Sequence, residues 1–230
     1  MRELPSLFIF DLDGTLVDTV PDIAVALNAA LVELELPPVS EANTRRWVGN
    51  GARALCGRAI AQSAEDTADP KLAERLLERF LRCYAARTAH ASTIYSGVLD
   101  AFAWLQSKDR VLACVTNKPM EHTRKLLRAL DLEKFFRIVI GGDSLPRRKP
   151  DPLPLIECLR VAGVPPGEAI MIGDSDNDIA AARAAGMDSI AVTYGYSQGR
   201  DVNTLGATSV LESLADLPAC FEQPRKERAS

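Results

Sequence analysis

The chain has 230 residues, of which 47% are hydrophobic, and a formal net charge of −4 at pH 7. This composition is typical of a globular protein with a sizeable core, arranged as one large domain or two modest ones. Lys and Arg are scattered along the chain, which argues against nucleic acid or an acidic membrane as a partner. Residues 1–6 carry no secretion pattern and no window is long and apolar enough to span a bilayer, so we expect a cytoplasmic protein.

An unbroken apolar run at residues 7–10 leads directly into Asp11 and Asp13. Such a run predicts a strand buried on both faces, as at the centre of a parallel sheet. Gly14 allows the chain to turn sharply after the strand. Ligands bind at the carboxyl ends of strands in open α/β sheets, so two acids here indicate a site. Taken alone, the stretch also fits a plain turn with solvated carboxylates.

Residues 20–93 carry helical periodicity and no convincing strand. Apolar residues recur at helical spacing over residues 23–34, and a turn signal at residues 49–51 interrupts the next helical segment. Asp69-Pro70 marks the start of another helix. The block is therefore predicted to be entirely helical.

This helical block separates the first predicted strand from the later ones, which favours an insertion over a terminal domain. We predict an all-α domain at residues 20–93, inserted into a second domain formed by residues 1–19 and 94–221. Residues 222–230 are charged and lack apolar partners, so they predict a frayed tail.

Helix and strand patterns alternate from residue 98 onward. Short apolar runs predict buried strands, and the helical patterns between them predict the crossovers of a parallel sheet. The predicted strands after the first cover residues 111–115, 138–140, 169–172 and 189–193. We therefore expect an α/β fold whose core is a doubly wound, Rossmann-like parallel sheet.

Three of the predicted strands end in polar or acidic residues, and parallel strands deliver these ends to one edge of the sheet. The residues are Asp11, Asp13, Thr116, Asn117, Asp174 and Asp178. A cluster of carboxylates repels itself unless a cation lies among them, and Mg²⁺ held by a few carboxylates, water and substrate phosphate is the simplest candidate. Lys149, in a loop next to Pro150, is a candidate for further positive charge.

These segments resemble the four motifs of the haloacid dehalogenase superfamily, which appear in order across essentially the whole chain. The matching stretches are Asp-Leu-Asp-Gly-Thr-Leu-Val-Asp at 11–18, Thr-Asn-Lys at 116–118, Lys-Pro at 149–150, and Gly-Asp-Ser with Asp178 at 173–178. The helical insertion after the first strand is similar to the cap domain of that superfamily. The resemblance implies a Mg²⁺-dependent enzyme that acts on a small phosphate ester, as a monomer or homodimer.

Three further segments are similar to bacterial phosphatases that act on 2-phosphoglycolate. They are Val-Gly-Asn-Gly-Ala at 48–52, Gly-Gly-Asp at 141–143 and Thr-Tyr-Gly-Tyr at 193–196. These are weaker signals than the four motifs. The implied reaction is hydrolysis of 2-phosphoglycolate to glycolate and phosphate.

The resemblance also implies roles for individual residues in a two-step phosphoryl transfer. Asp11 attacks phosphorus and forms an aspartyl-phosphate, and Asp13 protonates the leaving oxygen and later activates water. Mg²⁺ is held by Asp11, Asp174 and the main-chain carbonyl of Asp13. Asp178 either binds the metal directly or orients Lys149 or a water.

Phosphoryl oxygens are held by Thr116 and the Asn117 amide, while Lys149 offsets charge between nucleophile and phosphate. As isolated residues, Thr116 and Asn117 also fit a helix cap, and Asp178 also fits a favourable charge at a helix N-terminus.

Substrate contacts from the helical insertion are expected at the Gly49-Asn50-Gly51 turn. Arg53 follows this turn and is a candidate partner for a substrate carboxylate, with a solvated surface arginine as the alternative. Asp18 and Asp22 are expected to cap the first helix of the insertion. Neither His90 nor His122 shows the spacing of a metal ligand.

Other functions remain open from the sequence alone. They are a phosphatase for a sugar phosphate, nucleotide or pyrophosphate, a phosphosugar mutase, and a metabolite-binding protein without turnover. Dehalogenase activity is disfavoured because Asp13 is present. A phosphonate-cleaving relative needs a lysine in the cap, where Lys71 is the one lysine between residues 19 and 92.

Overall fold

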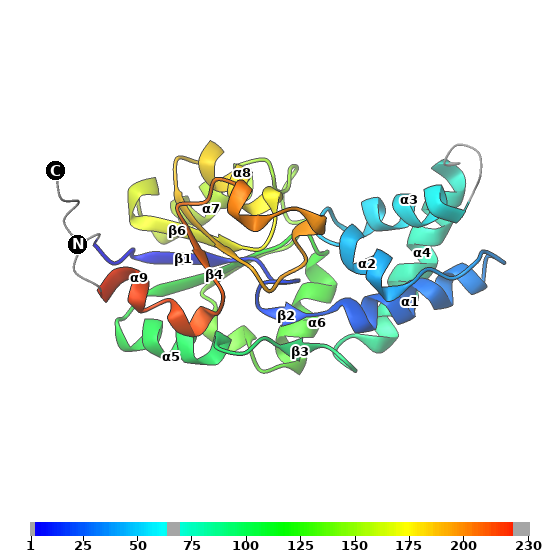
Figure 1. Cartoon of the computed structure of the whole chain (residues 1–230), viewed down its shortest axis with the longest axis horizontal. Helices are drawn as coiled ribbons and strands as arrows, with labels where there is room; N and C mark the ends of the chain where they lie inside the picture. Colours follow the sequence, from blue (N-terminus) through cyan, green and yellow to red (C-terminus); the bar gives the residue numbers. More distant parts are fainter. Residues whose placement is uncertain (1–2, 64–69, 223–230) are drawn as a thin grey trace.

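The computed structural model describes residues 3–63 and 70–222, and its centre is a six-stranded sheet (Figure 1). The strand order is β5-β4-β1-β6-β7-β8, and every neighbouring pair runs parallel. These strands are β1 (Leu7–Phe10), β4 (Val111–Val115), β5 (Ile138–Ile140), β6 (Ala169–Gly173), β7 (Asp188–Val192) and β8 (Ser209–Leu211). The α/β class with a doubly wound sheet, predicted from the sequence, is confirmed.

Helices cover both faces of the sheet, so β1 is buried along its whole length. Alternate side chains of a strand point to opposite faces. Phe8 and Phe10 accordingly pack in one core with α5 and α6, and Leu7 and Ile9 pack in the other with α7 and α8. These helices are α5 (Val98–Ser107), α6 (Met120–Ala129), α7 (Leu153–Ala162) and α8 (Asp176–Ala184), and a short α9 (Ala219–Glu222) follows near the end. Short 3-10 turns lie at Glu133–Phe135, Pro166–Glu168, Ser197–Gly199, Val202–Thr204 and Leu214–Asp216.

A helical unit lies beyond the carboxyl end of β1 (Figure 1). It consists of α1 (Val20–Val32), α2 (Glu41–Trp47), α3 (Ala52–Ser63) and α4 (Pro70–Arg87). Its helices bury their own apolar cluster, which includes Leu27, Ile60, Leu76 and Phe80. Asp69, expected just before the last of these helices, lies outside the described residues.

A two-stranded antiparallel ribbon joins the helical unit to the sheet. It pairs β2 (Val17–Asp18) with β3 (Thr93–Ile94). The expectation of no strand within residues 20–93 is therefore wrong at Thr93. Two-residue strands carry no periodicity of their own. These two pair because the chain enters the helical unit and leaves it at the same place.

Asp22 does not cap the first helix, contrary to expectation. Its carboxylate accepts hydrogen bonds from the backbone N–H groups of Ala91 (3.0 Å) and Ser92 (2.8 Å) and from the Ser92 hydroxyl (2.6 Å). The carboxylate is buried and satisfies donors of the returning chain, which the sequence places about seventy residues away. Asp18 does accept from the N–H of Val20 at 3.4 Å, but its shorter contacts are with the Tyr196 hydroxyl (2.9 Å) and with Arg45 (3.1 Å).

The edge strand β8 was not predicted, because three residues with a half-exposed pattern give no apolar run. Of the tail expected at residues 222–230, Glu222 ends α9 and the rest lies outside the described residues. Within the described ranges, no helix combines the length and apolarity that crossing a bilayer requires.

Candidate active site

The carboxyl ends of the three central strands meet at one edge of the sheet. Because β1 lies between β4 and β6, with Phe10 in register with Cys114 and Ile172, the residues that follow these strands are neighbours in space. Asp11, Thr116 and Asp174 are thereby brought together from positions far apart in the sequence. All three are at least 90% buried.

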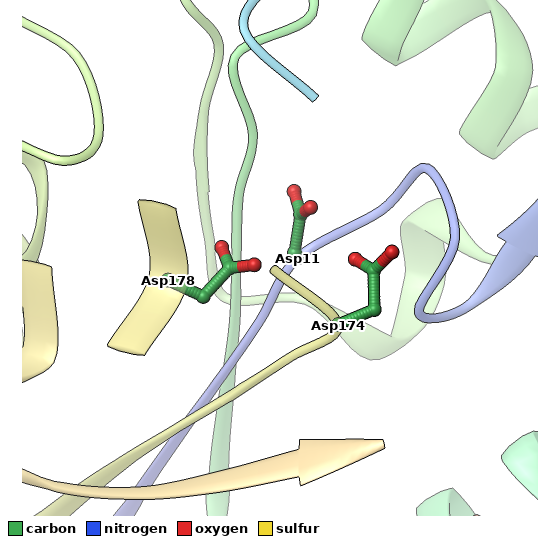
Figure 2. A group of neighbouring side chains, drawn as sticks. All are labelled: Asp11, Asp174 and Asp178. Carbon is green, nitrogen blue, oxygen red and sulfur yellow. The ribbon is translucent and has the colours of Figure 1, made fainter. Parts of the chain in front are cut away.

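Three buried carboxylates form an acidic cluster at this edge. Asp11, Asp174 and Asp178 each offer an oxygen within 4.8 Å of the others. Figure 2 shows Asp11 and Asp174 extending to the same side, with the carboxylate of Asp178 on α8 turned toward Asp11. The side chain of Asp13 is not part of this cluster.

The acidic cluster carries more negative charge than its surroundings offset. Burial, together with the charge of Asp178, raises the pKa of Asp11 to about 7 despite the opposing effect of Lys149. Burial and the charges of Asp178 and Asp11 raise the pKa of Asp174 to about 8. Oδ1 of Asp11 is buried without a hydrogen-bond partner. Buried carboxylate oxygens in this arrangement fit a hard divalent cation such as Mg²⁺.

Lys149 lies beneath the acidic cluster and is almost completely buried. Its ammonium is 2.7 Å from Oδ1 of Asp178, 2.6 Å from the carbonyl of Val115, and 2.9 Å from Oδ1 of Asp11, the last without hydrogen-bond geometry. Burial lowers the pKa of Lys149, but the charges of Asp11 and Asp178 outweigh this effect and raise it. The side chain therefore remains an ammonium.

Asp178 has partners for both of its oxygens. Oδ1 accepts from Lys149, and Oδ2 accepts from the backbone N–H (3.1 Å) and hydroxyl (2.7 Å) of Ser175 at the start of α8. This is a capping box, so the expected contribution of Asp178 to the helix N-terminus and its contact with Lys149 are both present.

Thr116 and Asn117 do not cap the helix that follows them. The N–H of Met120 at the start of α6 is instead accepted by Asp143 at 2.8 Å. The Asn117 amide donates to the carbonyls of Lys149 (2.9 Å) and Gly49 (3.0 Å), and its Oδ1 has no partner. Thr116 accepts the N–H of Lys118 at 3.2 Å.

Lys118 is a site residue that sequence reasoning missed. Its ammonium lies 2.9 and 3.0 Å from the two carboxylate oxygens of Asp13, and the hydroxyl of Thr19 donates to the same carboxylate at 2.7 Å. Lys118 is buried, and its position directly after Thr116 and Asn117 is the sequence signal that could have identified it.

The turn at residues 49–51 of the helical unit contacts the edge of the sheet. The carbonyl of Gly49 accepts from Asn117 and, at 3.2 Å, from Asn177. The Asn50 amide donates to Oδ1 of Asn177 at 3.2 Å, and Oδ1 of Asn50 accepts from Gln198 at 2.9 Å. The expected contact region thus lies against the site.

Two other residues of this region differ in their placement. A Cβ at Gly51, where φ is +86°, would approach the carbonyl of Asn117 to 3.2 Å. The turn of the helical unit and the segment after β4 are therefore in close contact there. Arg53 faces outward instead: its side chain is 65% exposed and pairs with Glu74.

A small cavity of about 50 Å³ lies between the sheet edge and the helical unit. From the sheet side it is lined by Asp11, Asp13, Thr116, Asn117, Lys118, Pro119 and His122. From the helical unit it is lined by Ile23, Val48, Gly49, Gly51, Ala52, Leu55, Phe80, Leu81 and Tyr84. The two predicted catalytic aspartates therefore line a space that is partly apolar.

An aspartate at the end of the first strand, a buried lysine and an acidic cluster at one edge of a parallel sheet fit a hydrolase of one family. The model of the haloacid dehalogenase-like hydrolases matches residues 8–192, and the chain belongs to this family of enzymes. It is 43% identical to phosphoglycolate phosphatase 1 of Pseudomonas aeruginosa over 96% of this chain and 81% of that one. It is 39% identical to a phosphoglycolate phosphatase of Nitrosococcus oceani over 97% of this chain and 99% of the relative.

A solved structure agrees with these sequence matches. The crystal structure of a predicted phosphoglycolate phosphatase from Haemophilus somnus 129pt has a TM-score of 0.89 to this chain and is 33% identical. The match covers 94% of this chain and 98% of that one.

Proposed function

We propose that the chain is a Mg²⁺-dependent phosphatase that hydrolyses 2-phosphoglycolate to glycolate and phosphate. The observation that carries this proposal is the cavity lined by Asp11, Asp13, Thr116 and Asn117, next to the acidic cluster to which Asp11 belongs. The names of the curated relatives support the choice of substrate.

In this proposal, Asp11 attacks phosphorus and forms an aspartyl-phosphate, while the bond from phosphorus to the glycolate oxygen breaks. Asp13 gives its proton to that oxygen and then takes a proton from the water that hydrolyses the aspartyl-phosphate. Lys149 keeps an ammonium against Asp11 and offsets negative charge as the phosphate approaches. Thr116 and Asn117 hold phosphoryl oxygens, and the unpartnered Oδ1 of Asn117 lies in the same cavity wall.

The acidic cluster fits Mg²⁺, with Asp11, Asp174 and the carbonyl of Asp13 as its ligands. When bound, the metal would supply positive charge against the phosphoryl oxygens. We assign Asp178 to the orientation of Lys149, because both of its oxygens already accept hydrogen bonds.

The helical unit would act as the cap that selects the substrate and excludes water. A cavity of about 50 Å³ lies between this unit and the sheet edge, at the place where a substrate would meet both. Residues 49–51 form the cap contact nearest the phosphate-binding residues.

A substrate profile tests the proposal. Phosphate release is measured for 2-phosphoglycolate, glucose 6-phosphate, AMP and pyrophosphate, with Mg²⁺ and with a chelator. We expect 2-phosphoglycolate to have at least about tenfold higher kcat/KM than the others, no turnover with the chelator, and loss of about three orders of magnitude in Asp11→Asn. Equal rates on sugar phosphates contradict the substrate assignment, and turnover by Asp11→Asn contradicts the mechanism.

A further inference from the structure

Unpartnered polar atoms gather around the cavity. In the described part of the chain, five buried side-chain polar atoms lack a hydrogen-bond partner, and four belong to residues that line this cavity. The four atoms are Asp11 Oδ1, Asn117 Oδ1, Tyr84 Oη and His122 Nδ1. Of these, Asp11 Oδ1 has an ion-pair partner in the ammonium of Lys149 at 2.9 Å. Since buried polar groups are normally paired, such a concentration points to a ligand that supplies the missing partners.

Two of these atoms have no role in the proposed phosphoryl transfer. Tyr84 comes from α4 of the helical unit and His122 from α6, and their rings lie 5.3 Å apart. The ammonium of Lys118 lies 4.6 Å from the centre of the Tyr84 ring. All three side chains are more than 90% buried and line the cavity. They form a second polar group of side chains, separate from Lys149 and the acidic cluster.

The charge of this second group suits an anion. Lys118 is the single ammonium or guanidinium among the residues that line the cavity. An ammonium has three N–H donors: the two oxygens of Asp13 account for two of them, and the third lies against the Tyr84 side chain, whose own O–H can donate to a further acceptor. Burial and the charge of Lys118 lower the pKa of His122, which leaves a neutral imidazole beside the ammonium.

We propose that Lys118, Tyr84 and His122 form a subsite for a second anionic group of the substrate, a carboxylate one carbon away from the phosphate ester oxygen. This inference rests on the proposed phosphatase function and specifies which side chains recognise the acid end of the substrate. The Tyr84 hydroxyl donates to the carboxylate, the Lys118 ammonium supplies the positive charge beside it, and His122 completes its hydrogen bonding. Arg53, the sequence-based candidate for this contact, is directed away from the cavity.

The subsite also joins the two parts of the molecule. Tyr84 belongs to the helical unit, whereas Lys118 and His122 belong to the segment that follows β4. A carboxylate bound between them therefore contacts both sides of the cavity at once. The rest of the wall from the helical unit is lined by apolar residues such as Leu55 and Phe80. A phosphate ester without a carboxylate would therefore find no other polar side chain there to bind.

The test compares 2-phosphoglycolate with phosphoglycolamide, in which an uncharged amide replaces the carboxylate. The measured quantity is the ratio of the two kcat/KM values in the wild type, Tyr84→Phe and Lys118→Met. We expect the ratio to fall about tenfold in Tyr84→Phe and about a hundredfold in Lys118→Met, as for hydrogen bonds to a charged group. Lys108→Met, at an exposed lysine directly after α5, is the control, and its ratio should equal that of the wild type.

The ratio distinguishes recognition of the carboxylate from a general loss of activity. An equal fall for both substrates in Lys118→Met would mean that Lys118 acts only on Asp13, and an unchanged ratio in Tyr84→Phe would likewise overturn the subsite. Tyr84→Phe removes a hydroxyl that has no partner, so it tests the subsite even where Lys118→Met does not fold. Failure of the proposed function appears differently, as a wild type that prefers sugar phosphates to 2-phosphoglycolate.

Discussion

The ammonium of Lys149 lies 2.7 Å from Oδ1 of Asp178, and both side chains are almost completely inaccessible to solvent. The other oxygen of Asp178 accepts hydrogen bonds from Ser175, so the start of α8 fixes the position of the Lys149 ammonium. Asp11, the proposed nucleophile, thus lies against a lysine whose position is fixed by the start of a helix.

Removal of this lysine should cost stability. Lys149→Met leaves Asp11 and Asp178 as buried carboxylates without their cation, and breaking a buried pair in this way costs about 3–5 kcal/mol. Urea unfolding at about pH 8 measures the loss. Lys134→Met is the control, because the exposed pair of Lys134 with Asp131 contributes at most about 1 kcal/mol. Equal losses in the two variants would contradict the assigned role of the buried pair.

Stability should depend on pH and Mg²⁺ together. The pKa values of Asp11 and Asp174, about 7 and about 8, lie above the ordinary value of 3.8, so the folded protein holds these protons more tightly than the unfolded chain. Their contribution to stability is fully present below about pH 3.8, declines as the pH rises above that value, and is lost once the pH has passed the folded-state pKa values of about 7 and about 8. Mg²⁺ binds the deprotonated cluster, so it should raise Tm more at about pH 8.5 than at about pH 5.5. A Mg²⁺ effect independent of pH, measured by thermal unfolding against a chelator control, would count against this linkage.

The Asn50 contact with the sheet edge should affect catalysis more than folding. Asn50→Ala removes the hydrogen bonds with Asn177 and Gln198, so the helical unit is held less firmly over the cavity, and it also removes a bond from Arg58 (2.6 Å) within that unit. We expect kcat/KM for 2-phosphoglycolate to fall about tenfold, as misplacement of positioning groups does. Asn43→Ala, at a half-buried asparagine whose amide bonds Gln62 and Arg46 within the same unit, should leave it unchanged. Steady-state kinetics give kcat/KM for both variants, and equal values would contradict the prediction.

Arg53 should contribute little to activity. Its guanidinium is 65% exposed and paired with Glu74, and it does not line the cavity. Arg53→Met should therefore change kcat/KM less than about twofold, the range of an exposed ion pair. A loss of tenfold or more would restore the sequence-based expectation that this arginine meets the substrate carboxylate.

Two tyrosine hydroxyls should respond differently to removal. The hydroxyl of Tyr196 accepts from the N–H groups of Thr19 (2.7 Å) and Val20 (3.2 Å) and donates to Asp18 (2.9 Å), whereas that of Tyr84 has no partner. Tyr196→Phe leaves buried donors unpaired and should destabilise the protein by about 1–3 kcal/mol. Tyr84→Phe should not. Thermal unfolding of the two variants under the same conditions makes the comparison, and equal shifts in Tm would contradict it.

The sheet was predictable because its strands are buried on both faces. Runs such as residues 7–10 and 169–172 are uniformly apolar, and the helical patterns between strands specify parallel crossovers. The pair β2–β3 and the edge strand β8 escaped prediction, since so few residues carry no period.

The sequence by itself determined the class of the fold and the candidate residues at the strand ends, Asp11, Asp13, Thr116 and Asp174, because a parallel sheet brings the ends of its strands to one edge. Only the tertiary structure decided which side chains these residues meet. The pairing of Lys118 with Asp13 spans 105 positions, and the contact between Asn50 and Asn177 spans 127. Such contacts leave no trace in local periodicity, because they depend on how the helical unit and the sheet pack together and on which polar groups that packing buries.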